Sequence, residues 1–595
     1  MTATTSTSLD VLSGEVRVPV PVLPAAGIRG WHLLVGVAIG MVAGMMRFWN
    51  LGAAFESSDQ CAMARMIHHS FGLRWMLAHD YGPTLPVVER VFSTAFNCLG
   101  IPSSEAACRF PVALLSLAQV LVSYPLLRRL GAGRGEASFT TLCVALLPTL
   151  VSDGHYAWGY LTTWLFTGTV ALWATIAWLD DHHPPQLAVA GIGLFLHCLS
   201  NVFAVGLPLV LLVIWVAAIV DRTTGPRRGN ESVSGRLRNS GCLGAFMPGF
   251  ALPCLAALAV IFLSWHWTGG GQLGRLIHKQ NHGALFGQLR QVLDLPTLWR
   301  AQFGYVFGVI AAAGLIWGCI QLRRPGSRRM GLLSIWALAA AFPLVILTDW
   351  RALGYLASYL GSYFIEVIYC AGMLGGVLLW RVLRHLGAGL APRVAAPLVA
   401  GLVVAWLGVG TADECLLGGK LTRLTGVKTG WGNVRPDTGI KATGAYVRKH
   451  VPSDCVIMSL HDNGGMEAPV AEYYLGRGVL ASYDLRSSMF EPLIAALGPR
   501  VDVLIVEPRH LAAAGRLSGF DLVCTLNREG QPVRYIYARP RWSLPRVDED
   551  VATLNGEYDR LHVPRRVPIA LSAPPDFDRL LGEYQKIGRG LKSAG

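Results

Sequence analysis

The amino-acid sequence predicts a polytopic α-helical membrane protein with an α/β domain at its C-terminal end. Hydrophobic residues make up 52% of the 595 residues and charged residues only 15%, which is too apolar for an ordinary soluble enzyme. Long apolar segments recur as far as Val409. After Gly410 they give way to short apolar runs separated by polar turns.

The apolar segments define the expected spans. A membrane-spanning helix needs roughly 17–25 predominantly apolar residues. About eleven segments approach that length, and several of them are short for a full crossing. They lie at 31–48, 110–127, 139–151, 161–179, 187–199, 203–220, 243–263, 303–320, 332–347, 359–380 and 395–409.

The basic residues predict the orientation of these spans. If the N-terminus is cytoplasmic, arginine clusters at 128–134, 222–238, 323–329 and 381–393 all lie inside, which is the positive-inside pattern. The connection 180–186 breaks this pattern with acids and histidines. We therefore expect a multi-pass protein of the inner (plasma) membrane. The net charge of +14 is spread between apolar runs, which favours membrane lipids as partners and argues against nucleic acid.

The chain divides into four expected parts. Residues 1–30 form a disordered cytoplasmic tail, and residues 31–410 form the membrane domain, whose first extracytoplasmic loop is 50–109. Residues 411–540 form an extracytoplasmic α/β domain, and 541–595 a C-terminal tail. In the α/β domain, branched apolar runs predict strands at 455–460, 501–506, 520–526 and 533–538, and helices are expected at 440–450 and 466–475.

The polar stretch 55–109 is the main candidate for function. Long ordered loops between spans usually bind a ligand or carry out chemistry. This loop begins with the acids Glu56 and Asp59. It continues through an amphipathic segment to Asp80, which precedes a Gly-Pro-x-x-Pro turn, and it ends in SSEAACRFPVALLSLAQV.

These motifs resemble the first extracytoplasmic loop of GT-C glycosyltransferases, in particular the protein mannosyltransferase and aminoarabinose transferase type. The resemblance implies the GT-C fold and a sugar donor linked to a polyprenyl phosphate, such as dolichyl or undecaprenyl phosphate. It implies an extracytoplasmic acceptor that is a protein, a lipid or a cell-envelope glycan. The sequence contains no nucleotide-phosphate loop of the GxxxxGK[ST] kind, which also favours a lipid-linked donor.

In the family, an aspartate at the place of Asp59 accepts the proton of the acceptor hydroxyl. A partly buried carboxylate suits this role, because burial raises its pKa toward neutrality. The family's Asp-Glu pair reads Asp59-Gln60 here, so the second acid is absent. Glu56 lies one helical turn earlier and would restore a second carboxylate. The alternative is that Glu56 and Asp59 only cap a loop helix.

Asp153, His155 and Tyr156 match a second family feature by type and place. In relatives, an acid in the second outer loop positions the acceptor or a metal ion, and an aromatic residue follows it. The sequence SDGHYAWGY has this order. The alternative is an ordinary turn at Ser152-Asp153-Gly154.

The donor phosphate needs positive charge near the loop. Relatives often carry a lysine in the turn that follows Asp80, and this chain lacks it. Arginine binds phosphate through two hydrogen bonds and lysine as a point charge, so either serves. The candidates are Arg90, Arg275, Lys279 and Arg351. For each of them, an interfacial cation without a ligand is an alternative.

The histidine pairs of the sequence do not predict a metal site. The paired histidines at 68–69 and 182–183 lack a further ligand at suitable spacing. Mg²⁺ or Mn²⁺ bound by Glu56, Asp59 and Asp153 stays open, because these ions prefer carboxylate oxygens.

The sequence thus predicts a glycosyltransferase that works by inverting displacement. Two other classes stay open. A non-catalytic scaffold or receptor would use the loop and the α/β domain only for binding. A transporter or flippase of lipid-linked sugars would need acids inside the spans, and the apolar segments are nearly free of ionisable groups.

Overall fold

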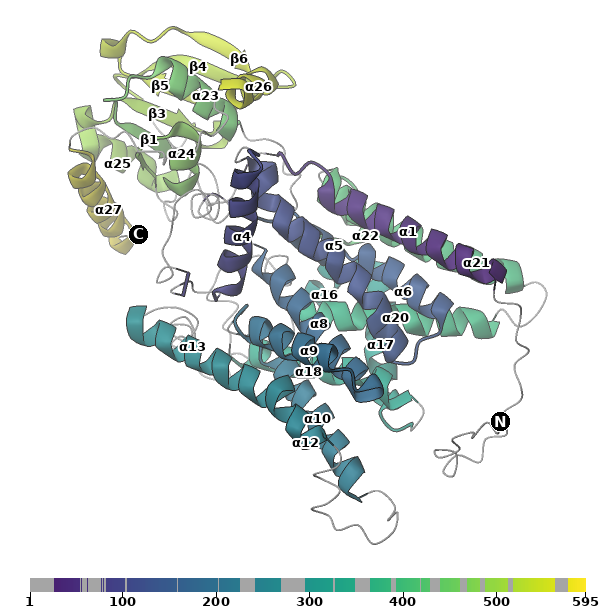
Figure 1. The fold of residues 1–595 in the computed structure, drawn as a ribbon. Helices are drawn as coiled ribbons and strands as arrows, with labels where there is room; N and C mark the ends of the chain where they lie inside the picture. Colours follow the sequence, from purple (N-terminus) through teal and green to yellow (C-terminus); the bar gives the residue numbers. More distant parts are fainter. Residues whose placement is uncertain are drawn as a thin grey trace, which may run out of the picture.

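The computed structural model consists of a helical bundle and a mixed α/β domain at one end of it (Figure 1). It describes residues 26–53, 55, 61, 76–77, 79, 82–101, 104–157, 159–201, 203–224, 241–268, 295–324, 327–347, 364–386, 392–417, 419–428, 439–460, 468–481, 487–511, 517–561 and 576–594.

The bundle contains a helix at every predicted span. Its helices are α1 (Ala26–Phe48), α4 (Thr84–Cys98), α5 (Glu105–Arg129), α6 (Arg134–Ala145), α7 (Pro148–Gly154), α8 (Tyr160–Asp181), α9 (Pro184–Cys198), α10 (Gly206–Thr224), α12 (Cys242–Phe246), α13 (Leu252–Thr268), α16 (Leu295–Phe303), α17 (Tyr305–Gln321), α18 (Arg328–Leu347), α20 (Ile365–Leu386), α21 (Pro392–Leu416) and the short α22 (Thr422–Thr425). One π-helical turn, Met247–Ala251, joins α12 to α13.

Five helices among the described residues are long and apolar enough to cross a membrane, or up to seven if each of two bent pairs is one span. Three shorter apolar helices, Leu33–Phe48, Pro184–Cys198 and Gly206–Val220, add to these. The chain thus has the helices of a multi-pass membrane protein. The count of about eleven crossings stays a prediction.

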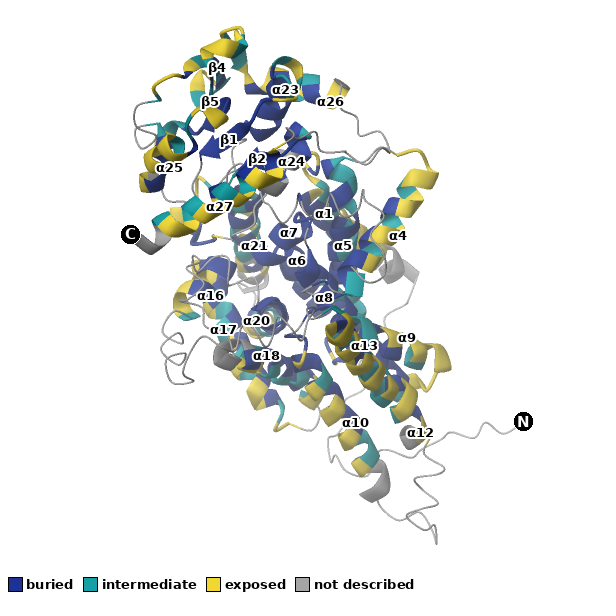
Figure 2. Ribbon diagram, turned by 90° about the vertical axis from the view of Figure 1, so that its left-hand side faces the viewer, coloured by how far each residue is buried: buried dark blue, intermediate teal, exposed yellow. Residues whose placement is uncertain are grey.

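Burial separates central from peripheral helices. α8 is the most buried of the long apolar helices, and α13 is the least buried (Figure 2). Leu255, Leu258 and Phe262 of α13 are exposed. An apolar helix face without protein cover is what a lipid-facing surface requires.

Two bends interrupt the bundle. α6 and α7 meet at 57°, and α16 and α17 meet at 114°. Pro148 begins α7, and Gly304 lies between α16 and α17 with a φ of 73°, a conformation that favours glycine. Each bend leaves backbone carbonyls open, and these need hydrogen-bond donors. Arg47 of α1 supplies one, since its Nη1 donates to the Ala145 carbonyl over 2.9 Å.

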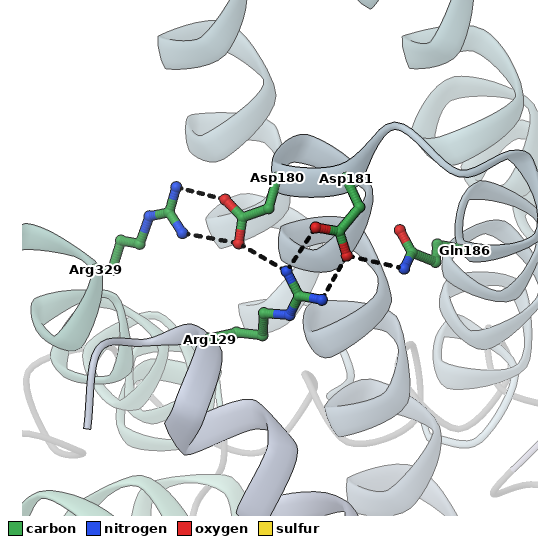
Figure 3. Close-up of polar contacts among 5 residues, drawn as sticks. All are labelled: Arg129, Asp180, Asp181, Gln186 and Arg329. Atoms are coloured by element: carbon green, nitrogen blue, oxygen red, sulfur yellow. Dashed lines mark hydrogen bonds and ion pairs between the residues drawn. The ribbon is translucent and has the colours of Figure 1, made fainter. Parts of the chain in front are cut away.

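Acidic and basic side chains pair at the end of the bundle that is predicted to be cytoplasmic (Figure 3). Arg129 at the end of α5 pairs with Asp180 at 3.3 Å and also with Asp181. Arg329 at the start of α18 pairs with Asp180 at 2.7 Å. The acids that break the positive-inside pattern are therefore counter-ions of arginines from other helices.

The C-terminal domain is built on one mixed sheet with the order β2-β1-β3-β5-β4-β6. The strands are β1 (Ile457–Leu460), β2 (Val479–Leu480), β3 (Val503–Val506), β4 (Asp521–Arg528), β5 (Gln531–Ala538) and β6 (Val547–Asp550). β1 is parallel to β2 and β3, whereas β5 is antiparallel to β3 and β4. Glu529 and Gly530 both have positive φ, as a two-residue hairpin turn between β4 and β5 requires.

Helices α23 (Ile440–His450), α24 (Ala468–Leu475), α25 (Phe490–Leu497), α26 (Val551–Leu561) and α27 (Phe577–Ala594) complete this domain. The four predicted strands and two predicted helices are all present. The expected boundary at 541 does not coincide with the sheet, because β6 pairs in parallel with β4. Phe577, Leu580 and Tyr584 of α27 pack in the core beneath β1 and β3. The described residues after 541 thus form sheet and packed helices rather than a separate tail.

α17 and α20 pack closely through glycines, and this contact provides a test of the fold. A Cβ atom at Gly314 would lie 2.7 Å from the Cα of Gly375, so Gly314→Ala forces two helix backbones apart. Overpacking of this kind costs about 1–3 kcal/mol. We expect Gly314→Ala to lower the melting temperature in detergent. Gly401→Ala is the matched control, because a Cβ there has no neighbour within 4 Å. Equal melting temperatures for the two variants would contradict the α17–α20 packing.

Candidate functional site

The predicted site residues fall into two groups. Glu56, Asp59, Asp80, Arg275, Lys279 and Arg351 lie outside the described residues, so their roles stay predictions. Asp153, His155, Tyr156 and Arg90 are described. Phe55 and Cys61 are also described and lie on either side of Asp59 in the sequence.

Arg109 fixes the start of the first loop. It lies in the first turns of α5 and is 1% exposed. Its Nη1 donates to the Leu51 carbonyl over 2.7 Å and also to the Ala53 carbonyl. Its guanidinium lies 4.7 Å from the centre of the Phe55 ring. A buried guanidinium needs several acceptors, and here the backbone that leaves α1 provides them.

Asp153 is buried at the end of α7 and is bonded to the start of α8. Its Oδ2 accepts hydrogen bonds from the Thr162 backbone N–H at 2.7 Å and from the Thr162 hydroxyl at 2.6 Å. Thr162 lies in the first turn of α8, whose N–H groups have no partner within the helix. A carboxylate is also favoured there by the helix dipole. The described contacts of Asp153 are therefore those of a cap.

His155 and Tyr156 follow Asp153 and are both buried, at 0% and 2% exposure. The His155 ring interacts with the carbonyls of Met46 and Arg47, which are at the end of α1. The cluster of α1, α7 and α8 thus brings Asp153 and His155 to the ends of neighbouring helices. Whether either residue contacts a substrate stays a prediction.

Arg90 is exposed on α4, and the residue before it is a buried acid that sequence reasoning missed. Glu89 is 2% exposed, and its Oε1 has no hydrogen-bond partner among the described residues. Burial raises the pKa of the Glu89 carboxyl well above its usual value. The helical spacing could have distinguished the buried Glu89 from the exposed Arg90. Leu85 and Glu89 are four residues apart and lie on one buried face of α4, whereas Arg90 lies on the exposed side.

Tyr474 joins the C-terminal domain to the first loop. The Phe55 backbone N–H donates to its Oη over 2.6 Å, and the Tyr474 hydroxyl donates to Glu105 Oε1 over 3.1 Å. Burial and the nearby Glu105 raise the pKa of Tyr474 well above its usual value, so the hydroxyl keeps the proton that it donates. Tyr474 therefore contacts the start of the first loop directly. Arg477 instead donates to the carbonyls of Val451 and Pro452 within its own domain.

The spans contain few ionisable groups, and two of these lie together. Glu366 at the start of α20 and His197 at the end of α9 are 1% and 0% exposed, with 3.6 Å between Oε1 and Nε2. The indoles of Trp164 and Trp336 also interact with the Glu366 carboxyl, without making hydrogen bonds of ordinary geometry. Both residues lie near the ends of apolar segments, where hydropathy does not reveal the pairing of acid and histidine.

Metal ligands and disulfides give no further site in the part of the chain that the structure describes. No group of three His, Cys, Asp or Glu residues is close enough there to hold a metal ion. Two of the three acids proposed for Mg²⁺ or Mn²⁺, Glu56 and Asp59, lie outside that part. Cys98 and Cys108 form no disulfide among the described residues.

Comparison with known proteins identifies the fold. No protein-family model matches the chain, and no curated protein sequence matches it significantly. The oligosaccharyltransferase of Archaeoglobus fulgidus in its apo form superposes with a TM-score of 0.50 at 14% identity, over 87% of this chain and 76% of that one. ArnT from Cupriavidus metallidurans bound to undecaprenyl phosphate gives 0.49 at 15% identity, over 87% and 98%. The mycobacterial arabinofuranosyltransferase AftD gives 0.43 at 14% identity, over 86% and 41%.

The GT-C fold that the sequence resemblance implied is therefore confirmed as a fold. The superposition with the oligosaccharyltransferase covers both the helical bundle and most of the remaining chain. At this level of identity the likeness concerns architecture alone, and function is argued from the residues.

Two substitutions at Asp153 test its capping role. Asp153→Asn keeps an oxygen that accepts from Thr162, whereas Asp153→Ala leaves two buried donors without their acceptor. A lost buried partner costs about 1–3 kcal/mol. We expect the Ala variant to unfold at a clearly lower temperature than the Asn variant, measured by thermal unfolding in detergent. Identical unfolding of the two variants would show that the contact with Thr162 does not stabilise the bundle.

Proposed function

We propose that the chain is a membrane glycosyltransferase that moves a sugar from a polyprenyl-phosphate donor to an extracytoplasmic acceptor. One observation carries this proposal: a chain with the GT-C fold has an acid in its first loop between two fully buried residues, Phe55 and Cys61, that are each 0% exposed. Buried residues that flank an acid in the sequence suit a site that has to hold a base in place.

The proposed reaction is a single displacement with inversion. Asp59 accepts the proton of the acceptor hydroxyl, and the hydroxyl oxygen forms a bond to the anomeric carbon of the sugar. The bond between that carbon and the phosphate oxygen breaks, and polyprenyl phosphate leaves with the electron pair. Asp59 then returns its proton to water. The leaving phosphate is stable as an anion, so the reaction needs positive charge near it rather than an acid.

Arg90 is the described candidate for that charge. It is exposed on α4 within the first loop, and no described acid pairs with it. Arginine in this state is available for a phosphate, which it binds through two parallel hydrogen bonds. Arg275, Lys279 and Arg351 are further candidates. The acceptor class stays open between protein, lipid and cell-envelope glycan.

The proposal predicts a specific loss in Asp59→Asn. Removal of a general base slows a reaction by about 10²–10⁴-fold. In cells that lack the gene we expect one sugar modification of an envelope glycan, lipid or protein to be missing. Wild-type protein restores it and Asp59→Asn does not, as measured by mass spectrometry of glycans and lipids.

Asp578→Asn is the matched control, because Asp578 is an exposed aspartate on α27 of the C-terminal domain. It should restore the modification like the wild type. Both variants need to reach the membrane in equal amounts with equal melting temperatures. Full restoration by Asp59→Asn would remove Asp59 from the mechanism, and no missing modification at all would favour the scaffold.

A second candidate function is transport of lipid-linked sugars, and the Glu366–His197 pair favours it. Buried acids near histidines inside a bundle are typical of proton-coupled transport. The pair joins α9 to α20, two helices that would have to separate in an alternating-access cycle.

Glu366→Gln separates the two functions. Glutamine keeps the shape of the side chain and removes its charge. For a glycosyltransferase, we expect transfer by the purified Glu366→Gln protein to stay within about threefold of the wild type, because the pair is not part of the proposed reaction. Sugar transfer is measured in detergent with lipid extract as donor. For a transporter, neither protein would transfer sugar in detergent, and Glu366→Gln would abolish movement of the lipid across vesicle membranes.

A further inference from the structure

Two helices of the C-terminal domain, α23 and α24, contact the membrane bundle at one buried carboxylate. Glu105, the first residue of α5, accepts from the Tyr474 hydroxyl of α24 and lies 3.3 Å from the Lys441 ammonium of α23. Lys441 also pairs with Asp559 of α26. Glu105 and Lys441 are 6% and 4% exposed, so water does not replace these partners. Buried charges are stable only when they are paired and hydrogen-bonded, so this contact fixes the position of the domain on α5.

The same cluster holds the backbone before Asp59. Tyr474 Oη accepts the Phe55 backbone N–H, which is 419 residues away in sequence. The Phe55 ring packs between the Arg109 guanidinium and the Tyr473 ring, whose centre is 5.5 Å away. Arg448 of α23 donates to the Tyr474 carbonyl over 2.8 Å and so fixes the end of α24. The backbone and the ring of Phe55 are thus both bound by the C-terminal domain.

Cys61 lies in the same cluster on the other side of Asp59. It is 0% exposed and belongs to the same buried cluster as Phe55, Tyr474 and Tyr558. Phe55 and Cys61, the nearest described residues before and after Asp59 in the sequence, thus both lie in this cluster.

We propose that Tyr474 is a positioning residue for catalysis: the C-terminal domain, through the Tyr474 hydroxyl, fixes Phe55, four residues before the proposed base Asp59. This inference rests on the proposed function and gives the C-terminal domain a part in the reaction. The domain need not contact the sugar. It acts by binding Phe55 and Glu105 with one hydroxyl, so the position of the base depends on a residue more than 400 positions away in the sequence.

Tyr474→Phe tests this role, since it removes only the hydroxyl and keeps the aromatic packing. Tyr584→Phe is the matched control, because Tyr584 of α27 is 2% exposed and its hydroxyl has no hydrogen-bond partner among the described residues. The purified full-length proteins are assayed with the lipid extract of cells lacking the gene as donor. We expect Tyr474→Phe to lower the maximal rate at least tenfold. The half-saturating amount of extract should stay within twofold, because donor binding does not involve the hydroxyl.

Alkylation of Cys61 gives a second measurement that does not depend on activity. Membranes are treated with N-ethylmaleimide, and modification of Cys61 is followed by mass spectrometry. We expect Tyr474→Phe to speed the modification at least fivefold at a temperature where both proteins remain folded, because Phe55 loses its hydrogen bond to the cluster that buries Cys61. Tyr584→Phe should match the wild type in both measurements.

The outcomes separate the inference from the proposed function. If wild-type protein transfers sugar and Tyr474→Phe transfers it equally fast, the positioning role is wrong and the proposed function stands. If Tyr474→Phe is slow but Cys61 stays protected, the hydroxyl acts in another way and the inference is also overturned. If the wild type transfers no sugar, the proposed function fails, and the catalytic role of Tyr474 fails with it.

Discussion

The carboxylate of Glu105 is the constraint on which the arrangement of the whole chain depends. It lies at the first turn of α5, where free backbone N–H groups favour a negative charge. It is buried, so it also needs partners of its own, and Tyr474 and Lys441 provide them from the C-terminal domain. The domain therefore cannot rotate on the bundle without leaving a charge unpaired in a low-dielectric place, which is costly.

The same requirement explains the polar residues within the bundle. Arg47 donates to the Ala145 carbonyl at the bend between α6 and α7. Arg109 donates to the Leu51 carbonyl that follows α1. Asp153 accepts a hydrogen bond from the Thr162 N–H, one of the open N–H groups at the start of α8. Without water in the surrounding lipid, each irregular piece of backbone needs such a side chain. These three residues thus satisfy backbone groups at helix ends, and Arg109 does so where the first loop begins.

Much of the fold follows from local sequence patterns. Apolar length located every bundle helix that the sequence analysis expected, and branched apolar runs located β1, β3, β4 and β5. β6 escaped notice because its sequence, VDED, is acidic and its strand lies at the edge of the sheet. Asp180 and Asp181 appear as exceptions to the positive-inside rule, since their partners Arg129 and Arg329 come from other helices.

The candidate site could be predicted less completely, because its contacts join distant parts of the chain. The family resemblance indicates Asp59, but no sequence pattern near Asp59 predicts that the preceding Phe55 contacts Tyr474. Glu366 and His197 escaped notice for the same reason, since each looks like a single polar residue at the end of an apolar run. For Asp153 the sequence suggested more than its contacts show. Its place and residue type fit a catalytic acid, but its described hydrogen bonds are those of a helix cap.

The central claim is that this chain consumes a sugar linked to a polyprenyl phosphate. The most direct test is to incubate purified full-length protein with the lipid extract and the envelope fraction of cells lacking its gene, and to follow the lipids by mass spectrometry. We expect a polyprenyl-phosphate sugar that accumulates in those cells to disappear, and one polyprenyl phosphate to form for each sugar transferred. A lipid profile identical with and without the protein would contradict it.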